Sequence, residues 1–145
     1  KLSSHLLEKI IVRQIERTPQ NPALYSLQGD FNLSRIRYAE AIDAYEKALA
    51  LKPDSPATLN NLAWLLATCD DERLRDPPRA LELARRAARL EPSAYILDTL
   101  AQSYYANGML REAVRAEKRA LEVAKGDRSL YERQLQKFEE AVDRP

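Results

Sequence analysis

The sequence predicts an all-α protein in which about eight antiparallel helices stack into a right-handed α-α superhelix. Three observations predict this fold class. Ala, Leu, Arg and Glu are abundant while the chain has only three glycines, which is a helical composition. One helix–turn–helix pattern recurs three times, and prolines follow the copies at similar intervals. Repeated helical hairpins that cannot bury an apolar face alone bury it by stacking on their neighbours.

Composition limits the classes of protein that this chain can be. A chain of 145 residues fits one domain, 1–145, and is long enough to bury a sizeable core. Its formal net charge is +1, so no overall field attracts nucleic acid or a membrane surface. Its one cysteine cannot form an internal disulfide, and no apolar run is long enough to cross a membrane. We expect a soluble segment, and the single cysteine does not decide between a reducing and an oxidising compartment.

The three repeats carry paired alanines on one face of the second helix. The repeating segments begin at Tyr25, Leu59 and Leu97. Each pair is separated by seven positions, which is about two helical turns, so both members lie on the same face. Small side chains there let a neighbouring helix approach closely. The pairs are Ala41 and Ala48, Ala80 and Ala87, and Ala113 and Ala120.

Local signals place the helix starts and two flanking helices. A capping residue stands directly before a proline, as at helix N-termini, in Asn21-Pro22, Ser55-Pro56 and Asp76-Pro77. Residues 3–18 form an amphipathic helix with apolar Leu6 and Ile10, in the slot of a preceding repeat's second helix. Residues 128–142, which open with Ser129 and Glu132 in capping-box spacing, form a helix that covers the last apolar face.

This pattern resembles the tetratricopeptide repeat family, whose unit is a helix–turn–helix of about 34 residues. The family places a small residue in the first helix, two alanines in the second helix and a proline behind it. Gly29, Ala63 and Ala101 match in the first helices, the alanine pairs match in the second, and Pro53 and Pro92 follow. The resemblance implies repeats at 22–54, 56–92 and 94–126.

The first repeat departs from the family pattern. Gln28 and Asn32 stand at positions that are usually apolar, and Ile36 stands where a turn glycine is common. We expect this helix to bury Leu24, Leu27 and Phe31 instead. An aromatic position of the family's second helix is kept only as Tyr45 and becomes Ala84 and Glu117 in the later repeats.

The second repeat has five extra residues between its helices, because Pro53 and Pro92 are 39 residues apart whereas Pro19 and Pro53 are 34 apart. The insertion follows Cys69 and begins with Asp70, Asp71 and Glu72, which suggests a metal or redox site. However, a thiolate and carboxylates suit different metals, and no second cysteine or nearby histidine is present. We interpret the segment as a solvated turn with Cys69 half-buried at a helix end, and expect neither a metal nor a cofactor.

No pattern indicates catalysis or nucleic-acid binding. His5 is the only histidine and lies far along the chain from Cys69, and no glycine-rich phosphate loop is present. Basic clusters at 85–89 and 115–119 are interleaved with glutamates, which favours a solvated helix face over a nucleic-acid surface. These glutamates are Glu82, Glu91, Glu112, Glu117 and Glu122. We expect a protein that is not an enzyme, binds no nucleic acid and does not insert into a membrane.

The resemblance implies a binding groove, because first helices line the concave side of the family's superhelix. The candidate groove residues lie beside the packing stripe of each first helix: Ser26, Asp30, Leu33, Asn60, Trp64, Ala67, Asp98, Gln102 and Tyr105, with Tyr95 nearby. Trp64 and Tyr105 are the expected anchors. The alternative is that they pack against an adjacent helix or the C-terminal helix.

Two classes of function remain open. The favoured one is an interaction scaffold that binds a polypeptide segment with apolar anchors and a positive charge near Asp30 or Asp98. The alternative is a structural segment that self-assembles through the helix at 3–18, or a regulatory part of a larger enzyme. Some family members hold a peptide's terminal carboxylate with lysines, an arginine and asparagines. The matching positions are Ser26, Asp30, Asn61, Tyr95 and Thr99, so only the asparagine is kept and such a clamp is not expected.

Overall fold

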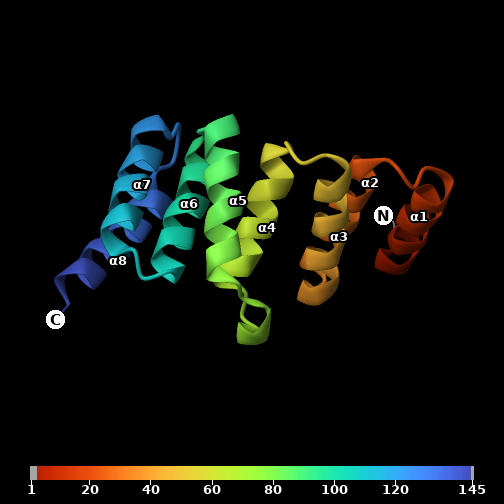
Figure 1. The fold of residues 1–145 in the computed structure, drawn as a ribbon, viewed down its shortest axis with the longest axis horizontal. Helices are drawn as coiled ribbons and strands as arrows, with labels where there is room; N and C mark the ends of the chain where they lie inside the picture. Colours follow the sequence, from red (N-terminus) through yellow and green to blue (C-terminus); the bar gives the residue numbers. More distant parts are fainter. Residues whose placement is uncertain (1–2, 145) are drawn as a thin grey trace.

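The protein is an all-α superhelix, as the sequence predicts. The computed structural model describes residues 3–144, and this part of the chain contains eight α-helices and one 3-10 helix. The helices stand side by side in one row, with α1 at one end and α8 at the other (Figure 1). In chain order they are α1 (Ser4–Arg17), α2 (Pro22–Ser34), α3 (Tyr38–Leu51), α4 (Pro56–Thr68), η1 (Glu72–Leu74), α5 (Pro77–Leu90), α6 (Ala94–Ala106), α7 (Leu110–Val123) and α8 (Ser129–Asp143).

Two of the four predicted helix caps are present. The Asn21 side chain accepts a hydrogen bond from the Ala23 amide at 3.1 Å, and the Asp76 side chain accepts one from the Arg79 amide at 3.2 Å. Ser55 does not cap α4; its hydroxyl lies 3.1 Å from Thr58 Oγ1. At α8 the predicted capping box is wrong, because Ser129 is already helical and its amide donates to Asp127 at 2.9 Å.

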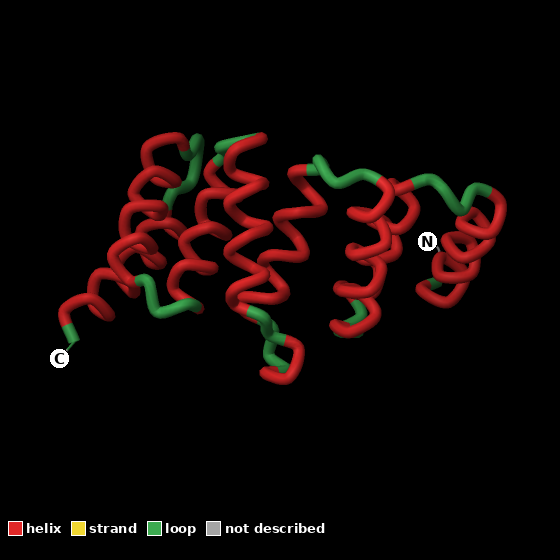
Figure 2. Tube along the Cα trace, in the orientation of Figure 1, coloured by secondary structure: helices red, strands yellow, loops and turns green. Residues whose placement is uncertain are grey.

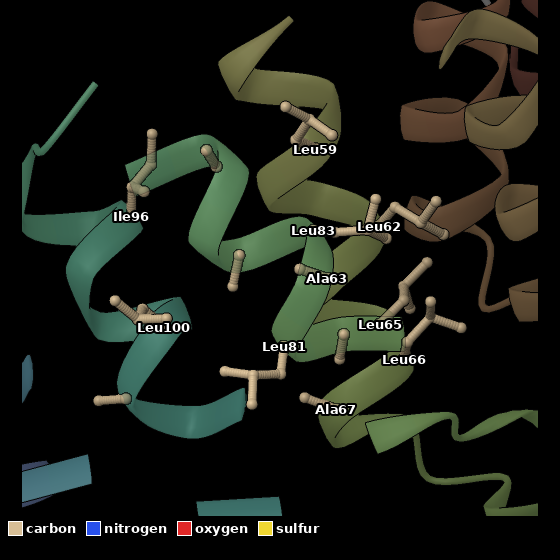
Figure 3. Packing of buried hydrophobic residues seen from close by; sticks show 14 of the residues in the cluster. Leu59, Leu62, Ala63, Leu65, Leu66, Ala67, Leu81, Leu83, Ile96 and Leu100 are labelled. Atoms are coloured by element: carbon tan, nitrogen blue, oxygen red, sulfur yellow. The ribbon is translucent and has the colours of Figure 1, made fainter. Parts of the chain in front are cut away.

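The core is a continuous layer that passes from repeat to repeat. All six paired alanines are buried, so neighbouring helices approach closely at these positions. In Figure 3, Leu59 and Leu62 of α4, Leu81 and Leu83 of α5, and Ile96 and Leu100 of α6 contribute side chains to the layer. Burial of each such leucine or isoleucine stabilises the fold by about 1.5–3 kcal/mol. α4 and α6 therefore pack directly on each other.

Gly29 is required by its aromatic neighbour. A Cβ at this position would overlap the ring of Tyr45, which is completely buried between α2 and α3. The small residue in the first helix of repeat 1 thus provides space for the aromatic residue kept in its second helix.

The turn between α2 and α3 has an unusual residue at its centre. Ile36 has a φ of 60°, in the left-handed region that branched side chains rarely adopt. The equivalent turn between α6 and α7 has Gly108 at a φ of 73°. Both turns close with the same backbone hydrogen bond, Arg37 N to Asn32 O and Met109 N to Tyr104 O, each 2.9 Å long. The two turns share one geometry with different residues.

The N-terminal helix α1 packs on α2 with one face only. Ile11 is buried, and Glu8 forms an ion pair of 2.8 Å with Arg37 at the start of α3. Leu6, Ile10 and Val12 stay exposed at 44%, 40% and 42%. α1 therefore leaves the face that carries Leu6 and Ile10 uncovered by the other described helices.

The extra residues of the second repeat form an ordered turn around η1, which extends from one side of the row (Figure 2). The Arg75 side chain donates to the carbonyl of Cys69, and the Asp76 amide donates to Leu66 O at 2.9 Å. Cys69 is 3% exposed, so our expectation of a half-buried residue is wrong: it ends α4 under this turn. Among residues 3–144, no cluster of three or more His, Cys, Asp or Glu is placed to hold a metal ion.

Candidate functional site

A cleft of about 510 Å³ lies between the first helices of repeats 1 and 2. Its walls are α2 and α4, and its end is formed by the last turn of α3 and the residues that follow. The lining residues are Pro22, Ala23, Ser26, Leu27, Asp30, Ala48, Lys52, Ser55, Ala57 and Thr58. Two of them, Ser26 and Asp30, are candidate groove residues from the sequence.

The cleft exists because repeats 1 and 2 are less closely packed than repeats 2 and 3. α4 packs along α6, whereas α2 and α4 meet at few positions. Leu27 of α2 is therefore 47% exposed at the cleft, and the expectation that it is buried is wrong. Its neighbours across the cleft, Ala57 and Thr58, are too small to fill the space. An exposed leucine on a cleft wall is a potential apolar contact for a ligand.

Hydrogen bonds fix the polar side of the cleft. Tyr45 Oη donates to Asp30 Oδ1 at 2.6 Å, and Asn61 Nδ2 donates to the same oxygen from α4 at 3.3 Å. The hydroxyls of Ser26 and Thr58 are 2.8 Å apart, which also joins α2 to α4. Burial and the Asp30 carboxylate raise the pKa of Tyr45, so its phenol remains a donor at all physiological pH values. The carboxylate of Asp30 is thus held in place at the surface.

Trp64 lies on the wall of α4 beyond Asn61. Ala57, Asn61 and Trp64 are spaced by four and three residues, so they form one stripe of the helix. The indole is 36% exposed, which leaves part of its face accessible. Trp64 is not one of the lining residues of the cleft; it lies about two turns along α4 from the lining residue Ala57, on the same stripe of the helix.

The ten candidate groove residues are in different environments. Ser26, Asp30 and Leu33 of α2, Trp64 of α4, and Tyr95 and Tyr105 of α6 are exposed or half-buried. Asn60, Ala67, Asp98 and Gln102 are buried. Tyr95 is turned toward Glu91, to which its hydroxyl donates at 3.0 Å. Ser26 and Asp30 line the cleft from α2, and Trp64 lies on α4, the helix that forms the opposite wall. The four buried candidates, all in repeats 2 and 3, are not accessible to a ligand.

Tyr105 packs on the C-terminal helix, as the alternative interpretation of this residue proposed. Its ring centroid is 5.1 Å from that of Phe138, and the Lys137 ammonium lies 4.6 Å from its centroid. Both partners belong to α8. Contacts of this kind hold the aromatic ring against the capping helix.

Asp98 of α6 and Glu117 of α7 form a buried acid pair within hydrogen-bonding reach of each other. Burial and the hydrogen bond to Asp98 raise the pKa of Glu117 to about 9. Burial also raises the pKa of Asp98, against the opposing charge of Lys137. The pair therefore keeps a proton at neutral pH, and Asp98 presents no exposed carboxylate to a ligand.

Sequence reasoning missed Leu27 and Thr58 as lining residues. Leu27 was expected in the core because it is apolar and lies about one turn from Leu24 and from Phe31, on the same stripe of the helix. A signal was nevertheless present: Gln28 and Asn32 replace apolar residues in the same helix, which indicates that repeat 1 packs differently from the others. Glu117 was also detectable, because it occupies a position where the family buries an aromatic residue.

Together, the helical hairpins and the inter-repeat cleft define a class: a helical repeat protein with a surface suited to another polypeptide. A sequence-family model described as "TPR repeat" matches residues 34–67. The small glutamine-rich tetratricopeptide repeat-containing protein 2 of Mycosarcoma maydis is 29% identical over 99 residues, which cover 66% of this chain. The chain spans 26% of the length of that relative.

Several solved structures share the fold. The MamA 41-end structure from Desulfovibrio magneticus RS-1 has a TM-score of 0.84 at 15% identity, covering 97% of this chain and 77% of that one. The Sgt2 TPR domain from Aspergillus fumigatus has a TM-score of 0.71 at 22% identity, covering 84% and 79%. The first TPR of Spaghetti (RPAP3), bound to the HSP90 peptide SRMEEVD, has a TM-score of 0.73 at 23% identity, covering 86% and 95%. This chain has the tetratricopeptide repeat fold, and residues 34–67 carry the sequence pattern of that family.

Proposed function

We propose that this protein is a non-catalytic interaction module that binds an extended polypeptide segment in the cleft between α2 and α4. The observation that carries the proposal is the cleft itself: its volume is about 510 Å³, and the side chains on its walls are small, polar or exposed and apolar. A role in protein interaction is also supported by the solved structures that share this fold, because one of them contains a bound peptide.

The side chains of the cleft suit a ligand with apolar anchors and one positive charge. Leu27 and Trp64 offer apolar and aromatic contact area, and such aromatic residues contribute disproportionately to interface energy. The hydroxyls of Ser26 and Thr58 are placed to exchange hydrogen bonds with a peptide backbone. Asp30 is held at the edge of the cleft as an anion, so a lysine or arginine of the ligand pairs with it.

The ligand differs from the acidic chaperone tail bound by one relative. Of the five positions matching the carboxylate clamp, only Asn61 is kept, and its amide is already bonded to Asp30. Asp30 itself would repel a terminal carboxylate at this place. The peptide SRMEEVD is therefore expected to bind far more weakly than a peptide with a basic residue between apolar ones.

A selection from a random peptide library tests the proposal. Peptides enriched on the immobilised protein are expected to lose at least about tenfold in affinity on Trp64→Ala or Leu27→Ser, which corresponds to about 1.4 kcal/mol. Leu90→Ser is the matched control, because Leu90 is equally exposed but lies outside the cleft, on α5. Circular dichroism confirms that each variant is folded. Unchanged affinity in both cleft variants would rule out this site.

Self-association through α1 is a second candidate, favoured by one observation. Leu6 and Ile10 are large apolar side chains one turn apart on the same face of the helix, and both remain exposed. Contiguous apolar surface of this kind tends to recruit a partner. In this proposal a second copy of the chain covers the face of α1 that α2 leaves free.

A further inference from the structure

We propose that the protein has a second interaction surface, a basic groove on the face formed by α5 and α7, which binds an acidic peptide segment. The groove has a volume of about 400 Å³. Leu100 and Tyr104 of α6 form its floor, and one wall is formed by four residues of α7, Glu112, Arg115, Ala116 and Arg119. Arg85 of α5 stands at the other wall. In Figure 1, α6 lies between α5 and α7, which both pack on it.

This groove lies on a different face from the cleft between α2 and α4. Leu100 and Tyr104 are on nearly the opposite side of α6 from Asp98, Gln102 and Tyr105, since each residue advances about 100° around the helix. The two surfaces share no lining residue. A ligand in one groove therefore leaves the other accessible.

Two of the three arginines at the groove have no acidic partner in the described part of the chain. The Arg85 guanidinium lies 5.5 Å from the centroid of the Tyr104 ring, and its Nε is 3.5 Å from the phenol oxygen. Neither Arg85 nor Arg119 forms an ion pair with any residue in the part of the chain that the structure describes. Arg115 pairs with Glu112, which also lines the groove, at 3.5 Å. Arg85 and Arg119 are therefore the guanidinium groups that remain available to a ligand.

The interleaved glutamates do less to balance this surface than the sequence suggests. α5 and α7 together carry eight arginines and lysines and four glutamates. One of the four, Glu117, points into the core and pairs with Asp98, so it adds no negative charge to the groove. The outer face of these two helices is therefore more basic than the net charge of +1 indicates.

The groove is specific to this end of the molecule. The equivalent space between α1 and α3 has Gln28 and Asn32 in place of Leu100 and Tyr104. Its α3 wall carries Asp43 where α7 has Arg115, while Glu40 and Lys47 match Glu112 and Arg119 in charge. Between α3 and α5 an ion pair, Arg79 to Glu46 at 3.0 Å, crosses from one second helix to the next. Between α5 and α7 both walls are basic, and no such pair crosses among the described residues.

The occupant that fits is an acidic peptide with an apolar side chain. Arginine forks bind carboxylates in a bidentate geometry, and close charge pairs at an interface stabilise a complex strongly. Leu100, Ala116 and the Tyr104 ring give an apolar floor for one side chain of the ligand. A nucleic acid fits less well, because Glu112 lies within the groove and interrupts its basic side chains. A short acidic segment can place its carboxylates at Arg85 and Arg119 alone, whereas a phosphate backbone carries charge at every nucleotide.

Peptide selection on a protein with a disabled cleft tests this surface separately from the first. A random dodecapeptide library is selected on the Trp64→Ala, Leu27→Ser variant, so that failure here and failure of the α2–α4 site are distinguishable. We expect acid-rich peptides with an apolar residue. Their affinity should fall at least about tenfold on Arg85→Ser with Arg119→Ser, and with rising salt. Arg13→Ser with Arg17→Ser, on α1, is the matched control and should have no effect.

Two results would overturn the proposal. One is that acid-rich peptides are not enriched, or bind the double arginine variant as tightly as the parent. The other is that a short double-stranded DNA binds through Arg85 and Arg119 more tightly than the selected peptides, which would make the groove a phosphate-binding surface.

Discussion

At the scale of single residues, Ile36 is the position where the sequence departs most clearly from what its backbone favours. Its φ of 60° is natural for the Gly108 of the equivalent turn but strained for a β-branched side chain. The side chain is 71% exposed, so it gains little from burial to offset that strain. The turn requires a residue with a left-handed backbone conformation at this position, and isoleucine adopts it with a loss of conformational free energy.

Replacing Ile36 by glycine should therefore stabilise the protein. We expect Ile36→Gly to raise the free energy of unfolding by about 1 kcal/mol, measured as a higher urea midpoint with an unchanged m value. Gly108→Ile, at the equivalent position, should lower it by a similar amount. A destabilised Ile36→Gly variant would mean that the isoleucine side chain makes contacts that outweigh the strain.

The buried acid pair makes stability depend on pH. The pKa of Glu117 is raised by burial from an ordinary 4.5 to about 9, so the folded state holds a proton that the unfolded state releases over this range. The stabilising effect of the protonated pair is complete at pH values below the pKa of Glu117 in the unfolded chain, and it is lost as the pH rises toward 9. We expect the free energy of unfolding to fall between about pH 6 and pH 8 by about 1 kcal/mol per pH unit.

Glu117→Gln should flatten this dependence, because a glutamine has no proton to lose. Lys137 and Tyr131 of α8 face the pair and stay in place in the variant. Glu122→Gln, an exposed position on the same helix, serves as the control and should keep the slope of the parent. The free energy of unfolding is measured by urea unfolding at each pH. If it falls with pH equally in the parent and in Glu117→Gln, the buried acid pair is not the cause of the pH dependence.

At the scale of helices, most of the architecture could be predicted from the sequence. The repeated alanine pairs predicted the alternation of first and second helices, because close helix packing needs small residues at fixed positions. The proline-marked starts predicted the first residues of α2, α4 and α5. The start of α8 was predicted with the wrong cap, since Asp127 competes with Ser129 for the same role. A short capping motif alone does not decide between adjacent candidates.

The site was less predictable than the helices. A stripe assigned by helical periodicity specifies which way a side chain points, but it does not specify how far the next helix lies. α6 packs on α4 closely enough to bury Asn60 and Ala67, whereas the looser contact of α2 with α4 leaves Leu27 exposed. The distance between neighbouring first helices depends on the packing of the whole stack. For this reason the sequence predicted Leu27 as buried and Asn60, Ala67, Asp98 and Gln102 as groove residues, whereas the structure shows the reverse.

The free face of α1 leads to a prediction about assembly. We expect sedimentation velocity to show concentration-dependent association of the parent, because Leu6, Ile10 and Val12 expose apolar surface. Leu6→Ser with Ile10→Ser should shift the protein toward monomer. Leu130→Ser on α8 removes an equally exposed side chain elsewhere and should not. A parent that stays monomeric at high concentration would contradict this role for α1.

At the scale of the whole molecule, the row of helices presents two surfaces of different chemistry. The cleft near the N-terminal half combines small and hydroxyl-bearing side chains with Leu27, Lys52 and the fixed carboxylate of Asp30. The groove near the C-terminal half has two arginines of α7 on its wall and a tyrosine on its floor. Stacked repeats make this possible, since each inter-repeat space can change its lining without altering the core. Among residues 3–144, no helix is both long and apolar enough to span a membrane.

The central claim is that a polypeptide binds along the cleft beside Trp64, and this residue is the only tryptophan of the chain. Its fluorescence therefore comes from a single position, on the same stripe of α4 as the cleft residue Ala57. The direct measurement is a fluorescence titration of the parent with a peptide selected for the cleft. We expect the emission to shift to shorter wavelength as the half-exposed indole is covered, and to saturate at the affinity found by calorimetry. Binding by calorimetry with unchanged Trp64 emission would contradict the account.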